Sequence, residues 1–304
     1  MKIIRIATRK SMLALWQAEH VGKLITQINP DCKIELIKIT TSGDKFLEKP
    51  LIDIGGKGLF LKELEEAIME GKADIAVHSV KDVPYELPKG LHMPVILKRG
   101  NIADAFVSNI ANNIYELPEN SIIGTASLRR SAQLKILRPD CQFVPVRGNV
   151  QTRLAKLDSR EYDALILAAA GLIRLELTNR ITSYLSKEEC LPAVGQGAIG
   201  IECKIDAHGI LRVISKLNDS LTADCIIAER SMNAKLNGSC HTPIAASASI
   251  ENGVLTLDGL VATLDGKICL KVQAKGYRHQ ALEIGKDVAA KLIEQGAKKI
   301  IENR

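Results

Sequence analysis

Short apolar runs alternate with amphipathic stretches over the first two-thirds of the chain. Apolar runs of about four to eight residues between turn signals are typical of buried strands, and apolar positions about 3.6 residues apart are typical of helices. The pattern predicts strands at 2–7, 33–39, 74–80, 122–124, 142–146 and 163–169, and helices at 11–27, 59–69, 128–137, 150–157 and from about 171. This order of elements favours an α/β fold with parallel sheets.

The last third of the chain has a different pattern. A helix is predicted at 222–236 and another at 279–295, with three strand-like runs between them near 244–250, 254–263 and 267–275. The dipeptides Asn252-Gly253 and Asp265-Gly266 separate these runs, and both are typical of hairpin turns. We therefore expect a small α+β C-terminal domain with an antiparallel sheet.

The composition is that of a globular protein. The 304 residues are 46% hydrophobic and 25% charged, which excludes a disordered chain, and 3% aromatic, which disfavours a protein that stacks nucleobases. The longest apolar stretch, 164–173, is about half a membrane span, and charge interrupts the first residues too early for a signal peptide. Seven cysteines without a Cys-x-x-Cys motif disfavour disulfides and thiolate zinc sites. We expect a cytoplasmic protein with no membrane contact and no metal.

Two strand-to-helix junctions carry hydroxyl and arginine side chains. Residues 7–11 include Arg9 and Ser11, and residues 124–130 include Thr125, Ser127 and the pair Arg129-Arg130. The N-terminus of a helix offers free N–H groups and a partial positive charge, so it binds anions. Ordinary N-caps explain the serines equally well at either junction. Two such junctions in successive α/β units favour an anionic ligand held between two lobes.

The formal net charge of +6 is concentrated in one segment. Residues 125–160 contain eight basic residues and only two acidic ones, so their excess equals that of the whole chain. Those next to strand ends or helix starts are predicted to face one cleft: Arg129, Arg130, Arg147 and Arg153. Those later in their helices are predicted to lie at the solvated surface: Lys135, Arg138, Lys156 and Arg160. Without a Walker or dinucleotide fingerprint, a small molecule with several carboxylates fits better than a nucleotide.

Asp82 and Cys240 are the candidates for covalent or proton chemistry. Asp82 ends a predicted strand, where a carboxylate can stabilise a cation or exchange a proton with a nitrogen; a salt bridge to Lys81 or a turn cap explains it as well. Cys240 lies among turn-forming residues, and its thiol can be a nucleophile, an attachment point or an incidental loop thiol. His78 is more simply a packed strand histidine. The loop 55–58, with Lys57, can cradle an anion or cover a site.

These segments together resemble the porphobilinogen deaminase (hydroxymethylbilane synthase) family of tetrapyrrole and heme biosynthesis. The matching stretches, in the order and spacing of the family, are 7–17, 55–60, 78–84, 124–130, 147–153, 192–197, 229–230 and 238–244. They extend over essentially the whole chain, and their combination is specific although each alone is weak. Ser239 is a departure, because many relatives have glycine before the cofactor cysteine.

The resemblance implies a transferase with a dipyrromethane cofactor. The family cysteine that holds this primer through a thioether is matched by Cys240. Porphobilinogen units are added to it head to tail, each losing ammonia, and linear hydroxymethylbilane is released. The implied fold has two α/β lobes similar to those of periplasmic binding proteins, at 1–98 with 198–217 and at 102–193, and a C-terminal domain at 218–304. A monomer is implied as well. The few aromatic residues and the concentration of charge in one segment argue against a nucleic-acid partner.

The resemblance also assigns roles to residues. Asp82 matches the catalytic aspartate, which stabilises the azafulvenium cation left when ammonia departs. Cofactor contacts are implied for Lys81, Thr125, Ser127, Arg129, Arg130 and Arg147, and substrate contacts for Arg9, Ser11, Lys57, Phe60, Arg147, Arg153, Arg174 and Gln196. These side chains suit the acetate and propionate groups of each pyrrole. The alternative hypothesis is a non-catalytic anion-binding protein with the same two lobes.

Overall fold

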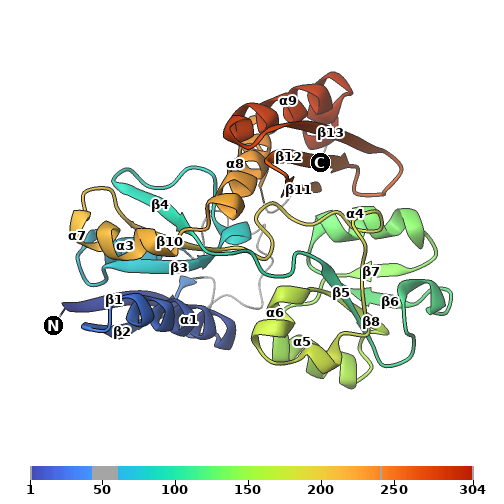
Figure 1. The fold of residues 1–304 in the computed structure, drawn as a ribbon. Helices are drawn as coiled ribbons and strands as arrows, with labels where there is room; N and C mark the ends of the chain where they lie inside the picture. Colours follow the sequence, from blue (N-terminus) through green and yellow to red (C-terminus); the bar gives the residue numbers. More distant parts are fainter. Residues whose placement is uncertain (1, 43–60, 240–241, 303–304) are drawn as a thin grey trace. The chain divides into compact units, whose positions relative to one another are not determined.

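The structure is a computed structural model that describes residues 2–42, 61–239 and 242–302. The chain divides into two compact units, one formed by Met1–Arg99 with Ala198–Ala223 and the other by Gly100–Gly197 with Asp224–Arg304. Described residues form three sheets, one in the first unit and two in the second (Figure 1). Because Ala198–Ala223 belongs to the first unit, the chain leaves that unit and later returns to it.

The first unit is built on a five-stranded mixed sheet of order β2-β1-β3-β10-β4. Its strands are β1 (Lys2–Arg9), β2 (Cys32–Ile39), β3 (Ile75–Ser79), β4 (Leu91–Ile96) and β10 (Ile199–Lys204). Its helices are α1 (Met12–Ile28), α3 (Lys62–Met69) and α7 (His208–Ile214), with 3-10 turns η1 (Val80–Asp82) and η4 (Ser215–Leu217). β1 runs parallel to β2 and β3, whereas β10 pairs antiparallel with both β3 and β4.

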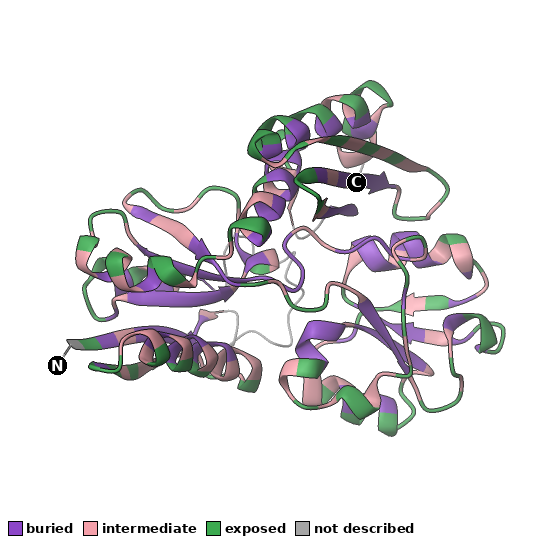
Figure 2. Cartoon of the chain, viewed as in Figure 1, coloured by how far each residue is buried: buried purple, intermediate pink, exposed green. Residues whose placement is uncertain are grey.

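Both faces of this sheet are covered by helices. Successive strand residues point to opposite faces, so Ile6 and Ala7 of β1 enter different cores. Ile6 packs in the core that receives Val21 of α1, and Ala7 packs in the core that receives Leu64 of α3. The strands at the centre are accordingly buried along most of their length (Figure 2).

The second unit begins with another five-stranded mixed sheet, of order β7-β6-β8-β5-β9. Its strands are β5 (Asp104–Ser108), β6 (Ile122–Gly124), β7 (Gln142–Val144), β8 (Ala164–Ala168) and β9 (Ser183–Tyr184). Its helices are α4 (Leu128–Leu137), α5 (Val150–Asp158) and α6 (Ala169–Arg174), with 3-10 turns η2 (Ile114–Glu116) and η3 (Thr178–Arg180). β6, β7 and β8 are parallel, so α4, α5 and α6 all begin at the same edge of the sheet.

The C-terminal segment contains an antiparallel meander. Helix α8 (Ser220–Lys235) leads into β11 (Ile244–Glu251), β12 (Val254–Ala262) and β13 (Cys269–Tyr277), which pair in sequence order. The turn η5 (Arg278–Gln280), α9 (Ala281–Glu294) and α10 (Ala297–Glu302) follow. Met232 of α8 and Val288 of α9 are fully buried in one core with β11 and β12. The expected fold class, two α/β sheets and a small antiparallel domain, is confirmed.

Most predicted elements are found within a few residues of their expected bounds. Four strands had not been predicted, namely β4, β5, β9 and β10, and all four belong to the antiparallel part of their sheets. No helix among the described residues is long and apolar enough to span a membrane.

Candidate active site

The carboxyl ends of β1 and β3 border a pocket in the first unit. These strands are adjacent and parallel, with Ala7 opposite Ala76, so the segments that follow them emerge side by side. The residues that line the pocket are Arg9, Ser11, Leu13, Ala14, Gln17, Leu61, Leu64, Val77, His78, Ser79 and Asp82. The structure thus brings together three residues that the sequence singled out, Arg9, Ser11 and Asp82.

Asp82 is available for chemistry at this pocket. It is exposed, and its carboxylate has no hydrogen bond or ion pair with the described residues. The alternative of a salt bridge to Lys81 is therefore not realised. The strand before it is held in place, because Gln17 Nε2 donates a hydrogen bond of 2.8 Å to Ser79 Oγ. A free carboxylate beside Arg9 on a fixed strand end can bind a cationic nitrogen.

At the pocket, His78 makes a buried pair with an acid that sequence reasoning missed. His78 Nε2 lies 2.8 Å from Glu202 Oε2 of β10, and both side chains are almost completely buried. This confirms His78 as a packed strand histidine. Partial burial and then the nearby charge of Glu202 raise the pKa of Glu65 on α3 to about 7, against a smaller opposing effect of His78. The first unit therefore holds an acid that titrates near neutral pH.

Serine hydroxyls begin the helices at both predicted junctions. Ser11 Oγ accepts a hydrogen bond from the Ala14 amide at the start of α1, and Ser127 Oγ accepts one from the Arg130 amide at the start of α4. Both bonds are 3.4 Å long. The N-cap interpretation is thus confirmed for each serine. Thr125 Oγ1 accepts from the Ser127 amide and shapes the same turn.

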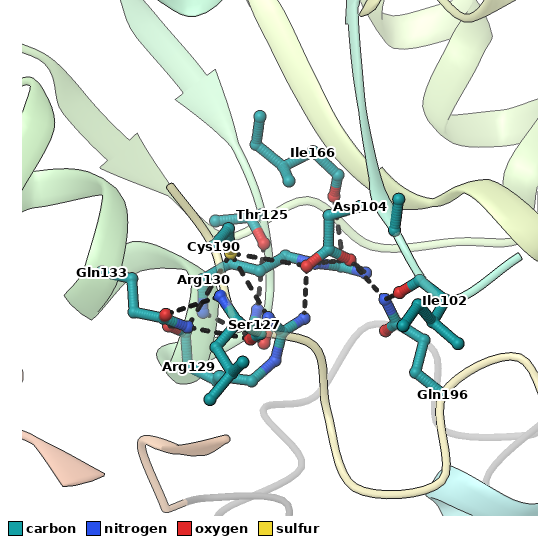
Figure 3. A network of polar contacts seen from close by, with 12 residues as sticks. Ile102, Asp104, Thr125, Ser127, Arg129, Arg130, Gln133, Ile166, Cys190 and Gln196 are labelled. Carbon is teal, nitrogen blue, oxygen red and sulfur yellow. Dashed lines mark hydrogen bonds and ion pairs between the residues drawn. The ribbon is translucent and has the colours of Figure 1, made fainter. Parts of the chain in front are cut away.

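Arg129 and Arg130, which the sequence predicts to face a cleft, are buried, with exposed fractions of 4% and 7%. Both pair with Asp104, which begins β5 and is fully buried (Figure 3). Gln196 joins them, with Nε2 2.9 Å from Asp104 Oδ1. The structure therefore brings three predicted site residues together around a carboxylate that was not predicted. Because Asp104 is 26 residues from Arg130 in sequence, counting charges within residues 125–160 could not find it.

Arg147 and Arg153 flank the start of α5. Both are half-buried, and Arg147 has no hydrogen bond or ion pair from its guanidinium to the described residues. Arg153 Nε donates to the Gly148 carbonyl at 2.8 Å. Gly148 has a φ of 105°, and a Cβ there would lie 2.7 Å from Thr152, so only glycine fits this turn between the two arginines.

Arg174 and Arg138 lie at the C-terminal ends of two other helices, α6 and α4. Arg174 Nη2 donates to the Gly197 carbonyl at 2.7 Å, and burial lowers the pKa of Arg174 to about 10. Arg138 was predicted at the solvated surface, which is wrong: it is 9% exposed. It ends α4, where its guanidinium binds Asp140 and the Ile114 carbonyl, so the local acid and backbone draw it inward.

Three predicted site residues, Lys57, Phe60 and Cys240, lie outside the described residues. Next to Cys240, the Ser239 amide donates to Thr242 Oγ1 at 2.6 Å, and Thr242 is buried. Burial raises the pKa of Cys190 to about 12 and that of Cys203 to about 11, which disfavours either as a thiolate nucleophile. Among the described residues, no group of three or more His, Cys, Asp or Glu side chains is arranged to hold a metal ion.

Comparison with protein families gives two matches that together extend over most of the chain. Residues 4–212 match the model for the porphobilinogen deaminase dipyrromethane cofactor binding domain, and residues 223–294 match the model for the porphobilinogen deaminase C-terminal domain. Curated relatives include the porphobilinogen deaminase of Neisseria meningitidis serogroup B, 49% identical over 300 residues, which are 99% of this chain and 96% of the relative. That of Vesicomyosocius okutanii is 52% identical over 302 residues and 99% of each chain.

Solved structures with a similar fold include the methionine-binding protein MetQ, with a TM-score of 0.45 and 12% identity over 71% of this chain and 89% of that one. The periplasmic VFT2 domain of Bordetella pertussis BvgS has a TM-score of 0.43 and 14% identity over 75% of this chain and 92% of that one.

Proposed function

Because the chain belongs to the porphobilinogen deaminase family, we propose that it joins porphobilinogen units head to tail, with loss of one ammonia from each, on a dipyrromethane primer, and releases linear hydroxymethylbilane. The protein is thus a transferase of tetrapyrrole biosynthesis. The observation that carries this function is the match of residues 4–212 to the dipyrromethane cofactor binding domain. An anion-binding protein without chemistry is not favoured, since curated deaminases are about half identical over nearly the whole chain.

In this proposal Asp82 is the catalytic residue. Porphobilinogen loses its aminomethyl nitrogen, and positive charge develops on the pyrrole ring as the nitrogen leaves. The carboxylate of Asp82 at the pocket is exposed and has no partner among the described residues, so it can stabilise that charge beside the pyrrole N–H and can hold the proton released there. Arg9 and Ser11 at the same pocket suit the acetate and propionate groups of the substrate.

The residues at the start of α4 and α5 fit a dipyrromethane with its four carboxylates. The two arginines on Asp104 leave one net positive charge, and Ser127 and Thr125 offer hydroxyls. The guanidinium of Arg147 has no partner within the described part of the chain. When bound, the cofactor supplies the pyrrole carbon onto which the first unit is added. We assign Lys81, Thr125, Ser127, Arg129, Arg130 and Arg147 to its carboxylates, and Arg147, Arg153, Arg174, Gln196, Lys57 and Phe60 to the substrate.

Cys240 is the proposed attachment point of the cofactor. It is the family cysteine by its sequence context, and the high pKa of the buried thiols of Cys190 and Cys203 makes them poor rivals. We further propose that the protein acts in the cytoplasm as a monomer. No disulfide links the six cysteines among the described residues, which suits a reducing compartment, and the monomeric state is carried over from the family.

The intact mass of the purified protein tests the cofactor and its attachment. We expect a species heavier than the 33.1 kDa chain by one dipyrromethane, and the loss of that added mass in Cys240→Ala. Cys269→Ala is the matched control, because Cys269 is a described free thiol and its removal should leave the added mass in place. An unmodified wild-type chain that still consumes porphobilinogen would contradict the assignment.

Replacement of Asp82 tests the chemistry. We expect Asp82→Asn to lower kcat by about 100-fold or more, in the range that proton-transfer groups contribute, with an unchanged melting temperature because the side chain is exposed. Glu86→Gln, which neutralises another exposed acid four residues later, should leave kcat near the wild-type value. Near-normal turnover in Asp82→Asn would exclude its charge from the reaction.

A further inference from the structure

Asp104 lies under the start of α4 because of its position in β5. Alternate residues of a strand share one face, so Asp104 points to the same side as Phe106. Phe106 packs in the core that contains Leu134 of α4, and Asp104 therefore reaches the first turn of that helix, where Arg129 and Arg130 lie (Figure 3). A fully buried carboxylate at this point needs partners, since burying a lone charge is costly.

Both carboxylate oxygens of Asp104 are used by groups from different segments. Oδ1 accepts hydrogen bonds from Arg130 Nε at 2.9 Å, Arg130 Nη2 at 2.7 Å and Gln196 Nε2 at 2.9 Å. Oδ2 pairs with Arg129 Nη2 at 2.8 Å and accepts from Cys190 Sγ at 3.4 Å. One side chain thus fixes two arginines of α4 and a glutamine from the loop before β10 relative to one another.

Backbone carbonyls also accept hydrogen bonds from the two arginines, but some guanidinium N–H donors stay unused by the described residues. Arg130 Nη1 donates to the Ile166 carbonyl, and Arg129 Nη1 donates to the Leu191 carbonyl. A guanidinium has five N–H donors, so each arginine has donors beyond those used in these contacts. Arg129 Nε is buried and has no hydrogen-bond partner in the described ranges, which is costly in a finished core and is expected where a ligand supplies the acceptor.

The charge balance also favours an anion at this place. Burial alone would raise the pKa of Asp104, but the charges of Arg129 and Arg130 and the hydrogen bonds from Arg130 and Gln196 hold it well below its usual range. The carboxylate is therefore negative at neutral pH and neutralises one of the two arginines. One net positive charge remains in a dry site, where it attracts a carboxylate more strongly than it would in water.

We propose that Asp104 is a positioning residue for the proposed reaction: it holds Arg129, Arg130 and Gln196 in the arrangement that receives carboxylate groups of the dipyrromethane primer and the growing chain. Asp104 itself does not touch these anions. Its contribution is to fix the direction of the guanidinium groups before the ligand binds and to prevent their mutual repulsion. This inference rests on the proposed function.

Asp104→Asn tests the proposal, since asparagine keeps the shape of the side chain and removes its charge. We expect the fraction of purified protein carrying the dipyrromethane mass to fall below that of the wild type. We also expect the loaded molecules to show kcat/KM for porphobilinogen lower by about 10- to 100-fold, as for other displaced supporting groups, mainly through a higher KM. Asp104→Glu keeps the charge and should restore loading, with a KM still above the wild-type value.

Asp140→Asn is the matched control. It removes the carboxylate that pairs with Arg138 at the other end of α4, so it costs a less buried carboxylate–arginine ion pair outside the site. Loading, kcat and KM should be unchanged in this variant, whatever happens to its melting temperature. A role of Asp104 in stability alone predicts the same behaviour for Asp104→Asn, and that result overturns the proposal.

Two further outcomes are decisive. If Asp104→Asn does not fold, Asp104→Glu decides: full loading with a raised KM supports positioning, and wild-type kcat and KM overturn it. If the wild-type protein itself carries no added mass and does not consume porphobilinogen, the proposed function fails. If the wild type is normal and Asp104→Asn is indistinguishable from it, only the positioning role of Asp104 fails.

Discussion

Acidic side chains in this protein are divided between those that are free to react and those that are bound in place. Asp82 is exposed at the pocket with no partner among the described residues, whereas Asp104 is fully buried between two arginines. Glu202 is equally buried, but among the described residues its only partner is a histidine, and its Oε1 accepts no hydrogen bond from them. Exposure and the lack of a partner therefore distinguish the candidate catalytic acid from two buried acids that other side chains hold in place.

Glu65 gives a prediction for the pH dependence of stability. Its pKa is about 7 in the folded protein against 4.5 for the ordinary group, so folding favours its protonated form. Stability is then lost as pH rises from about 4.5 through about 7. We expect Glu65→Gln to raise the free energy of unfolding at pH 8 by about 1–2 kcal/mol, a value discounted for the partial exposure of Glu65, and to change little at pH 4.

The measurement is denaturant unfolding of both proteins across this pH range. The groups that act on Glu65 are Glu202, His78 and Glu66. Glu66→Gln serves as the control, because Glu66 is exposed and only approaches Lys62 at 3.9 Å, so its effect should not change between pH 4 and pH 8 beyond about 0.5 kcal/mol. An equal gain for Glu65→Gln at both pH values would contradict the raised pKa.

At the scale of elements, the sequence predicts what local pattern encodes. The amphipathic helices and the parallel strands β1, β3, β6 and β8 follow from periodicity and from the turns that bound them. β10 was missed because Gly200 and Glu202 interrupt its apolar run, and a buried glutamate is acceptable only with its partner His78 on β3. β4 contains Pro94, which is tolerated because this strand is at the edge of its sheet.

The candidate site was likewise predictable where local sequence determines it. Ser11, Ser127 and Asp82 follow strand ends, so local sequence places them correctly at helix starts and at the pocket. The burial of Arg129 and Arg130 depends on Asp104, whose contact with them is long-range and set by strand order. The sequence contains one signal of this contact, because Asp104 is an acidic residue directly before the apolar run 105–107.

The contact of α9 with α8 gives a prediction at this scale. A Cβ on Gly285 would lie 2.3 Å from the Ala228 carbonyl oxygen and 2.8 Å from Ser231 Cβ, so the two helices touch there through backbone. Alanine is the better helix former by about 1 kcal/mol. We nevertheless expect Gly285→Ala to destabilise the protein by about 1–3 kcal/mol, because the helices must move apart.

Thermal or denaturant unfolding measures this loss, with Lys286→Ala as the control on the exposed face of the same helix. That substitution should change the free energy of unfolding by no more than about 0.5 kcal/mol. A stabilised Gly285→Ala protein would mean that helix propensity, and not the close approach of α8 and α9, decides the outcome.

At the scale of the whole molecule, the excess of positive charge is partly compensated where it is most concentrated. Asp104 binds Arg129 and Arg130, Asp140 binds Arg138, and Glu161 lies 3.9 Å from Lys156. Arg147 is left without a partner among the described residues. The attraction for a polycarboxylate therefore depends on a few placed side chains more than on the net charge of +6.

The salt dependence of substrate binding separates placed charge from net charge. Salt shortens the range of electrostatic attraction to about 10 Å at 0.1 M and about 3 Å at 1 M, so the KM for porphobilinogen should rise severalfold between about 0.05 and about 0.5 M salt while kcat changes little. Arg147→Gln should have a high KM already at low salt and a weaker salt dependence, since the partly buried guanidinium supplies much of the attraction.

Arg160→Asn removes the same charge from the same lobe, at an exposed position with φ of 62° that asparagine tolerates. Its KM should follow the wild-type value at every salt concentration, because a solvated arginine away from the site is screened. If Arg160→Asn and Arg147→Gln weaken the salt dependence equally, the substrate responds to the net charge of the protein, and the assignment of Arg147 to its carboxylates is wrong.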